Sequence, residues 1–129
     1  MYLDWHHTNT RAGCAGFLFS TWLLPMRGKP VDEYARDKSE RTIAASFKTI
    51  CDVFLASSPF LAGDRPTIAD LLAYQEIVQL AVVNHGYRAS GKYPQLNSWM
   101  DRMEQLSHLL QVNGVLNKVA AKAVSRSRL

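Results

Sequence analysis

The sequence predicts an all-α protein, and three observations carry that prediction. Apolar residues recur at spacings of three and four along several segments, as expected for helices that bury one face. No run of alternating apolar and polar residues marks a strand. The segment from residue 67 to residue 83 is apolar around nearly its whole circumference, which is typical of a helix at the centre of a helical domain. We therefore expect a bundle of about five helices around one buried, capped central helix.

Composition limits the possible partners. The chain has 129 residues, 47% of them apolar and 20% charged, which fits one domain with a real core. The net charge is +4, and much of the basic excess lies near the C-terminus, in Lys118, Lys122, Arg126 and Arg128. No aromatic residues interleave with these cations to form a stacking platform, so we expect a solvated helix end and no nucleic-acid partner.

Residues 2–24 are expected to form one long first helix. Its repeating face carries Trp5, Thr8, Ala12, Ala15, Phe19 and Trp22. Gly13 and Gly16 each cost about 1 kcal/mol in a helix interior, so they are expected where a ligand or another backbone comes close, or where packing needs a thin helix. Pro25 and Gly28 end the helix. Because Met1 stands almost inside it, without a cap, we expect a truncated chain.

The uncharged stretch from residue 12 to residue 26 is a possible targeting or membrane segment. It is shorter than the roughly 20 apolar residues that a spanning helix needs, and it lacks the features of a signal peptide. We interpret it as a buried helix and expect a cytoplasmic protein without a membrane partner. The two cysteines, Cys14 and Cys51, are expected to be buried free thiols.

A second long helix is expected over residues 32–56. Its apolar stripe, which we expect to face the core, consists of Ile43, Phe47, Ile50, Phe54 and Leu55. A loop with Gly63 and Pro66 follows. Thr67 then opens the central helix, which runs to Val83. Its hydroxyl and the carboxylate of Asp70 can cap the first backbone N–H groups reciprocally, which contributes about 1 kcal/mol.

Two further helices are expected toward the C-terminus. Pro94 suits the first position of a helix, and Leu96, Trp99, Met100 and Met103 form its apolar face. A last helix is expected over residues 107–124, followed by a frayed basic tail over residues 125–129. The loop residues Tyr87 and Arg88 are expected at the surface. Among the bulky apolar residues, Phe19, Trp22, Trp99, Met100 and Met103 are more typical of a core than of ligand contacts.

The residues alone predict no catalytic site. Four histidines are present, but His6 and His7 are adjacent and point about 100° apart on a helix, and no His-x-x-x-His spacing occurs. We therefore expect no metal site. The chain also lacks a glycine-rich phosphate loop and a Gly-x-Ser-x-Gly nucleophile motif.

Several motifs together resemble one family. They are the opening from Tyr2 to Arg11 with Trp5 and His6, Leu24-Pro25, Pro30-Val31, Phe60-Leu61-Ala62-Gly63, Thr67-Ile68-Ala69-Asp70-Leu71, Tyr93-Pro94-Gln95-Leu96, and Trp99 followed by Arg102 and Met103. This set is similar to the C-terminal helical domain of theta-class glutathione transferases, and the similarity extends over residues 1–124.

The resemblance implies an enzyme of two domains. A thioredoxin-like N-terminal domain, absent from this chain, would bind the co-substrate glutathione and carry the activating serine, so the chain itself would hold no catalytic residue, need no cofactor and be inactive alone. The complete enzyme would be a homodimer that joins the glutathione thiolate to an electrophilic small molecule. The residues expected to bind that substrate are Thr8, Arg11, Ala12, Ala15 and Phe19. Some members have Asp where this chain has Thr8.

A different function stays open. Domains of this fold also occur as non-catalytic protein-interaction modules in translation factors and synthetase complexes. The Trp5 to Arg11 helix and the glycine-thinned face favour the transferase, whereas the missing catalytic domain and the basic tail favour the interaction module.

Overall fold

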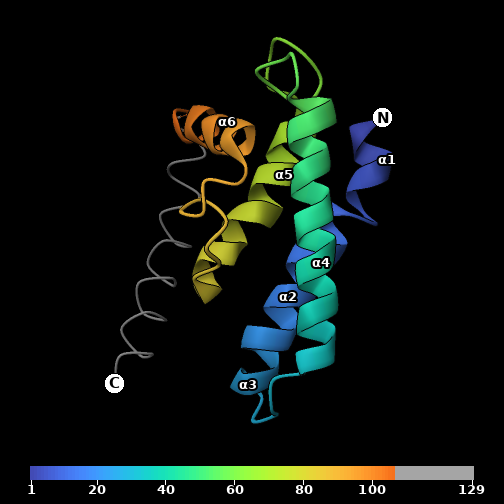
Figure 1. Ribbon diagram of the computed structural model, residues 1–129, viewed down its shortest axis with the longest axis vertical. Coiled ribbons are helices and arrows are strands. Elements are labelled where there is room, and N and C mark those ends of the chain that lie inside the picture. The colour runs from blue at the N-terminus through green and yellow to red at the C-terminus, as the bar shows by residue number, and fades with distance from the viewer. Residues whose placement is uncertain (107–129) are drawn as a thin grey trace.

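The chain folds into helical rods that run beside and across one another in the computed structural model, which describes residues 1–106 (Figure 1). The first rod contains α1 (Tyr2–His6), α2 (Thr10–Leu18), η1 (Phe19–Leu23) and α3 (Leu24–Met26). The second contains α4 (Glu33–Thr49) and η2 (Ile50–Phe54). The third contains α5 (Ile68–Val78) and η3 (Gln79–Val83), and the fourth is α6 (Pro94–Glu104). No strand occurs within the described range, so the all-α prediction is confirmed.

The prediction of one unbroken helix over residues 2–24 is wrong. The backbone leaves helical geometry at Asn9, whose φ and ψ are −123° and −82°. The Asn9 side chain donates to the Trp5 carbonyl oxygen at 2.9 Å, so a side-chain bond competes with the helical ladder. The apolar repeat continues through this break, and periodicity alone therefore could not locate it.

The rod from α2 to α3 is continuous but changes pitch. Ser20 and Thr21 donate their hydroxyls back to the carbonyl oxygens of Gly16 and Phe17, at 2.9 and 2.6 Å. Such back-bonding perturbs a helical ladder, and here it coincides with η1, a π-helical turn. The rod ends at Met26, close to the predicted Pro25 and Gly28 stop, and Gly28 has a positive φ of 75°.

The two glycines of the first rod allow a close approach between α2 and α4. A Cβ added to Gly13 would lie 3.0 Å from both the backbone nitrogen and the Cγ1 atom of Ile43. A Cβ added to Gly16 would overlap the Ser39 hydroxyl. Close packing against α4, on the Ile43 backbone at Gly13 and on the Ser39 side chain at Gly16, therefore explains both glycines.

The second rod closely follows its predicted bounds. Asp32 caps α4 by accepting from the backbone N–H of Ala35 at 3.0 Å. The predicted stripe lies inward, with Ile43, Phe47, Ile50 and Leu55 buried and Phe54 half-buried. The Phe54 ring packs edge-on against Tyr2 with centroids 5.0 Å apart, which holds α1 against η2.

The third rod is the predicted central helix. Its inward side chains include Ala73, Tyr74, Ile77 and Leu80, all nearly inaccessible to solvent. It tightens into the 3₁₀ turn η3 and ends at Asn84, whose φ of 55° is left-handed. One side remains uncovered in the described residues, because Ile68 and Leu72 are 62% and 41% exposed.

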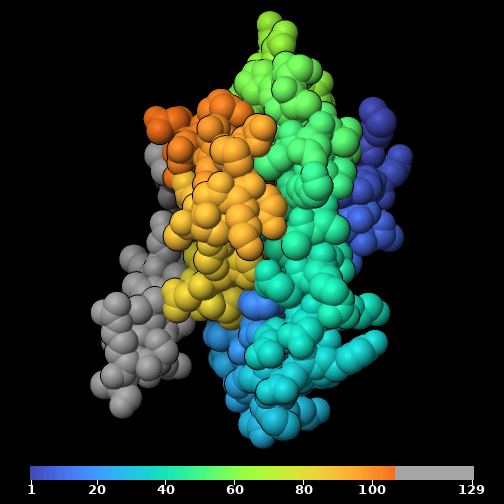
Figure 2. Space-filling model, viewed as in Figure 1, coloured from blue at the N-terminus to red at the C-terminus, as the bar shows by residue number. Residues whose placement is uncertain are grey.

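The fourth rod fills the remaining side of the core. Trp99, Met100 and Met103 are fully buried, as predicted, whereas Phe19 is 44% exposed and is not a core residue. Figure 2 shows α4 and α6 covering the viewed face, with the loop before α5 at one end. The last helix predicted over 107–124, the tail over 125–129 and the basic cluster of the C-terminus lie outside the described residues.

The loop between η3 and α6 is tied to both neighbours. His85 pairs through Nε2 with the Glu40 carboxylate of α4 at 2.7 Å. Arg88 donates to Asp101 and Glu104 of α6, each at 2.6 Å. Tyr87 lies between these ties and is buried, so its predicted surface position is wrong.

Candidate functional site

The five residues predicted to bind substrate lie on the outer side of the first rod. Thr8, Arg11, Ala12, Ala15 and Phe19 are all exposed. The buried side of the same rod carries other residues, namely Tyr2, His6, Thr10, Gly13, Cys14 and Ser20. We call this solvent-facing set the α2 strip: Arg11, Ala12, Ala15 and Phe19 lie on the continuous rod of α2 and η1, and Thr8 lies in the turn before it.

Three buried polar side chains lie beneath the N-terminal end of the α2 strip: Tyr2, His6 and Thr10. The Tyr2 hydroxyl lies 3.0 Å from both His6 Nδ1 and Thr10 Oγ1. Burial raises the pKa of Tyr2 well above its usual range, so the phenol stays protonated. These contacts join α1 to α2 across the break at Asn9 and fix the direction in which the α2 strip faces.

Arg11 forms an ion pair with a residue that sequence reasoning did not select. Its Nε atom lies 3.6 Å from Oε1 of Glu76, on the central helix α5. The Arg11 side chain is 58% exposed and the Glu76 side chain only 18%. The available signal was a carboxylate in the middle of an otherwise apolar helix, but the sequence could not say which helix Glu76 would face.

Partial burial shifts the pKa values of the groups around Arg11. Burial raises the pKa of Glu76, while the positive charges of Arg11 and His7 oppose that rise. Burial also lowers the pKa of His6, and His7 and Arg11 lower it further. Arg11 and His7 thus lie near one largely buried carboxylate, that of Glu76.

Apolar side chains extend the surface from α2 to α5. Ile68, Leu72 and Glu76 follow one another at intervals of four, so they share one side of α5. Leu3 of α1 is also exposed. Because Glu76 meets Arg11, this side of α5 adjoins the α2 strip. Small residues, an arginine and exposed apolar side chains therefore lie on one continuous face.

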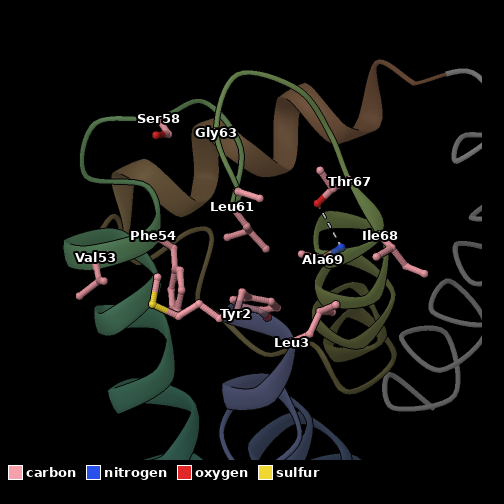
Figure 3. A pocket seen from close by; sticks show the side chains of 12 residues that line it. Tyr2, Leu3, Val53, Phe54, Ser58, Leu61, Gly63, Thr67, Ile68 and Ala69 are labelled. Carbon is pink, nitrogen blue, oxygen red and sulfur yellow. Dashed lines mark hydrogen bonds between the residues drawn. The ribbon is translucent and has the colours of Figure 1, made fainter.

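A cavity of about 480 Å³ lies at the end of the bundle, and Leu3 and Ile68 of the exposed face are among the residues that line it (Figure 3). Its walls come from the start of α1, from η2, from the loop before α5 and from the first turn of α5. Tyr2, Phe54, Leu61 and Ile68 make it mostly apolar. None of the five predicted substrate residues lines this cavity.

The predicted cap of α5 is present, and its residue Asp70 also bonds to two other segments. Thr67 Oγ1 accepts from the Ala69 N–H at 3.3 Å, and Asp70 Oδ2 accepts from the Thr67 N–H at 2.9 Å. Asp70 Oδ1 also accepts from the Leu61 N–H at 2.9 Å and from the Trp99 indole Nε1–H at 2.8 Å. Asp70 thereby joins the loop, α5 and α6, and its role is structural.

The cysteines of the described part of the chain lie inside the fold. Cys14 and Cys51 are buried and free, and burial raises the pKa of both thiols. No group of three or more His, Cys, Asp or Glu side chains within residues 1–106 could hold a metal ion. Among the same residues, no helix has both the length and the apolar character needed to cross a membrane.

A protein-family model matches most of the chain. Residues 15–107 fit the family described as glutathione S-transferase, C-terminal domain. Glutathione S-transferase T1 of Arabidopsis thaliana is 31% identical over 123 residues, which are 91% of this chain and 50% of that protein. Glutathione S-transferase theta-2 of Rattus norvegicus is 30% identical over 103 residues, which are 80% of this chain and 41% of that protein.

Solved structures agree on the fold. Human glutathione transferase theta-2, in complex with glutathione and an unknown ligand, has a TM-score of 0.82 at 24% identity. The match covers 97% of this chain and 52% of that one. Human glutathione S-transferase T1-1 in its apo form has a TM-score of 0.77. The chain thus spans about half of these structures and half or less of the curated relatives, and its resemblance to theta-class proteins is confirmed.

Proposed function

Since the chain belongs to the glutathione S-transferase C-terminal domain family, we propose that it is the substrate-binding domain of a theta-like glutathione transferase. The complete enzyme would join the thiolate of its co-substrate glutathione to an electrophilic small molecule. The domain spans residues 1–124, holds no catalytic residue of its own and needs no cofactor.

The observation that carries this proposal is the position of Arg11. Its side chain is more than half exposed on the α2 strip and adjoins an exposed apolar side of α5. A cation held at the edge of an apolar surface suits a reaction in which a thiolate attacks an apolar electrophile and an anion leaves.

The neighbouring residues give this surface a shape suited to a substrate. Ala12 and Ala15 leave room above the helix, and the exposed Phe19 ring provides an apolar wall. Thr8 adds a hydroxyl at the other end of the strip. A surface of this kind would become a pocket once another domain covers it, because a pocket needs walls on more than one side.

We propose that the covering partner is a thioredoxin-like, glutathione-binding domain. The exposed Leu3, Ile68 and Leu72 side chains are the apolar contacts it would bury. We further propose that the complete enzyme is a homodimer that acts in the cytoplasm.

Glutathione conjugation tests this proposal. We would compare the chain alone with the same chain joined to the N-terminal half of a theta-class relative, using an aryl halide, an alkyl halide and an epoxide as electrophiles. We expect activity only in the joined form, and a loss of about tenfold or more in kcat/KM for Arg11→Ala. Arg41→Ala, which removes another exposed arginine from α4, serves as the matched control and should leave kcat/KM unchanged.

Two outcomes would contradict the proposal. Equal activity of the Arg11→Ala and Arg41→Ala variants would remove the assigned role of Arg11. A joined protein that is folded but neither conjugates nor binds glutathione would favour a protein-interaction module, for which the same exposed apolar face is a suitable contact surface.

A further inference from the structure

Glu76 and Asp70 are the two acidic residues of α5, and they differ in their contacts. Asp70 caps the helix and also accepts from two other segments, the loop at Leu61 and α6 at Trp99, whereas the ion pair with Arg11 is the one contact of the Glu76 carboxylate that the described residues provide. A carboxylate that is four-fifths buried costs free energy unless it is paired. Its position directly beneath Arg11 therefore calls for a role at that site.

Arg11 and Glu76 interact through their charges and do not form a hydrogen bond. At 3.6 Å the Nε to Oε1 separation is too long for a hydrogen bond, so Glu76 reduces the charge of Arg11 without occupying its N–H groups. Arg11 makes no other ion pair within residues 1–106. Its terminal N–H groups, on the exposed end of the side chain, remain available to a ligand that competes with Glu76.

We propose, on the basis of the function proposed above, that Glu76 determines the charge preference of the substrate site. While ionised, Glu76 offsets part of the Arg11 charge, so the site favours uncharged, apolar electrophiles over anionic ones, and Arg11 keeps enough positive charge for its proposed role. An anionic ligand must compete with Glu76 for the guanidinium, and it binds better when Glu76 is neutral.

The charged surroundings of Glu76 support this assignment. Arg11 from α2 and His7 from the turn before α2 face it with positive charge, while the Tyr2 phenol and the Cys14 thiol are neutral neighbours. Burial raises the pKa of Glu76 above its ordinary value. Acidification therefore neutralises Glu76 sooner than an exposed glutamate, and anion binding at Arg11 should strengthen as the pH falls.

The test is an NMR titration of the full chain with sodium sulfate, at constant ionic strength, observed at the Arg11 Nε–H group. Sulfate stays a dianion over the whole pH range used. The variant Glu76→Gln keeps the size of the side chain and removes its charge. The matched control is Asp101→Asn, which makes the same change of net charge at another arginine–carboxylate pair, that of Arg88. The unaltered chain is also titrated with sulfate at acid pH.

We expect Glu76→Gln to bind sulfate at Arg11 up to about fivefold more tightly than the unaltered chain, the factor equivalent to an exposed ion pair of about 1 kcal/mol. Asp101→Asn should not change the affinity, and the unaltered chain should gain affinity as the pH falls. Equal affinity in all three proteins overturns the proposal, and so does an Arg11 signal that sulfate never shifts. The titration needs no catalysis, so its failure is distinct from a failure of the conjugation assay.

Discussion

Replacing Asp70 by Ala should destabilise the domain more than any other single change at a polar residue discussed above. The carboxylate is fully buried and holds three segments together: the loop at Leu61, the start of α5 at Thr67, and α6 at Trp99. Removing it leaves the Leu61 N–H and the Trp99 indole N–H buried without an acceptor, and it opens the cap at Thr67.

The magnitude follows from these three contacts. An unpaired buried donor costs about 1–3 kcal/mol, and a lost cap costs about 1 kcal/mol. Two donors and one cap together give about 4 kcal/mol, a large part of the roughly 5–15 kcal/mol that stabilises a typical domain. Asp70→Asn should cost about half as much, because its amide oxygen can still accept from Leu61 and Trp99 while its NH₂ group faces the Thr67 N–H.

The assay is urea unfolding followed by circular dichroism. With a slope of about 2 kcal/mol per molar urea, the midpoint should fall by about 2 M for Asp70→Ala and by about 1 M for Asp70→Asn. The exposed carboxylate of Asp101 provides the control, because Asp101→Asn should move the midpoint much less. An Asp70→Ala midpoint within the range of that control would refute the reasoning, since it would show that the three short contacts do not stabilise the fold.

Three further outcomes follow from the structure. Gly13→Ala should cost about 1–3 kcal/mol in unfolding free energy because the new Cβ meets the Ile43 backbone, whereas Gly86→Ala, with open space around it, should be neutral or slightly stabilising; equal urea midpoints would contradict this. The folded pKa of His6 lies below its unfolded value of 6.5, so His6 stabilises the fold above pH 6.5 and loses that contribution as the pH falls; His6→Gln should flatten this part of the stability profile, and an unchanged slope would argue against it. The chain without a partner domain should self-associate through its exposed apolar face, and Leu72→Glu should reduce that association; sedimentation showing a monomer of the unaltered chain at high concentration would disprove it.

Features that depend on residues three or four positions apart could be predicted from the sequence. The cap at Thr67 and Asp70, the helix start after Asp32 and the buried positions Trp99, Met100 and Met103 were all predictable, because capping and helical periodicity involve only near neighbours. The break at Asn9 was missed although it is equally local. The apolar repeat continues across it, and the competing bond from the Asn9 side chain leaves no mark on that repeat.

The direction in which each face points was decided by packing. The strip from Thr8 to Phe19 repeats as regularly as a core stripe, yet it lies outward, because Gly13 and Gly16 let α2 approach α4 with the opposite side. Phe19 is exposed for that reason. Tyr87, which looked like a loop residue at the surface, is buried because its neighbours His85 and Arg88 tie the loop down.

By itself, the sequence determined the all-α class, the central helix with its cap and the resemblance to theta-class transferases. Only the tertiary structure decided the partners of the charged groups. Asp70 and Trp99 are 29 positions apart, Glu40 and His85 are 45 apart, and Arg11 and Glu76 are farther apart still. Periodicity states which side of a helix is apolar, but not which sides of two helices meet. That meeting depends on how closely the backbones pack, and it is what places Glu76 beneath Arg11.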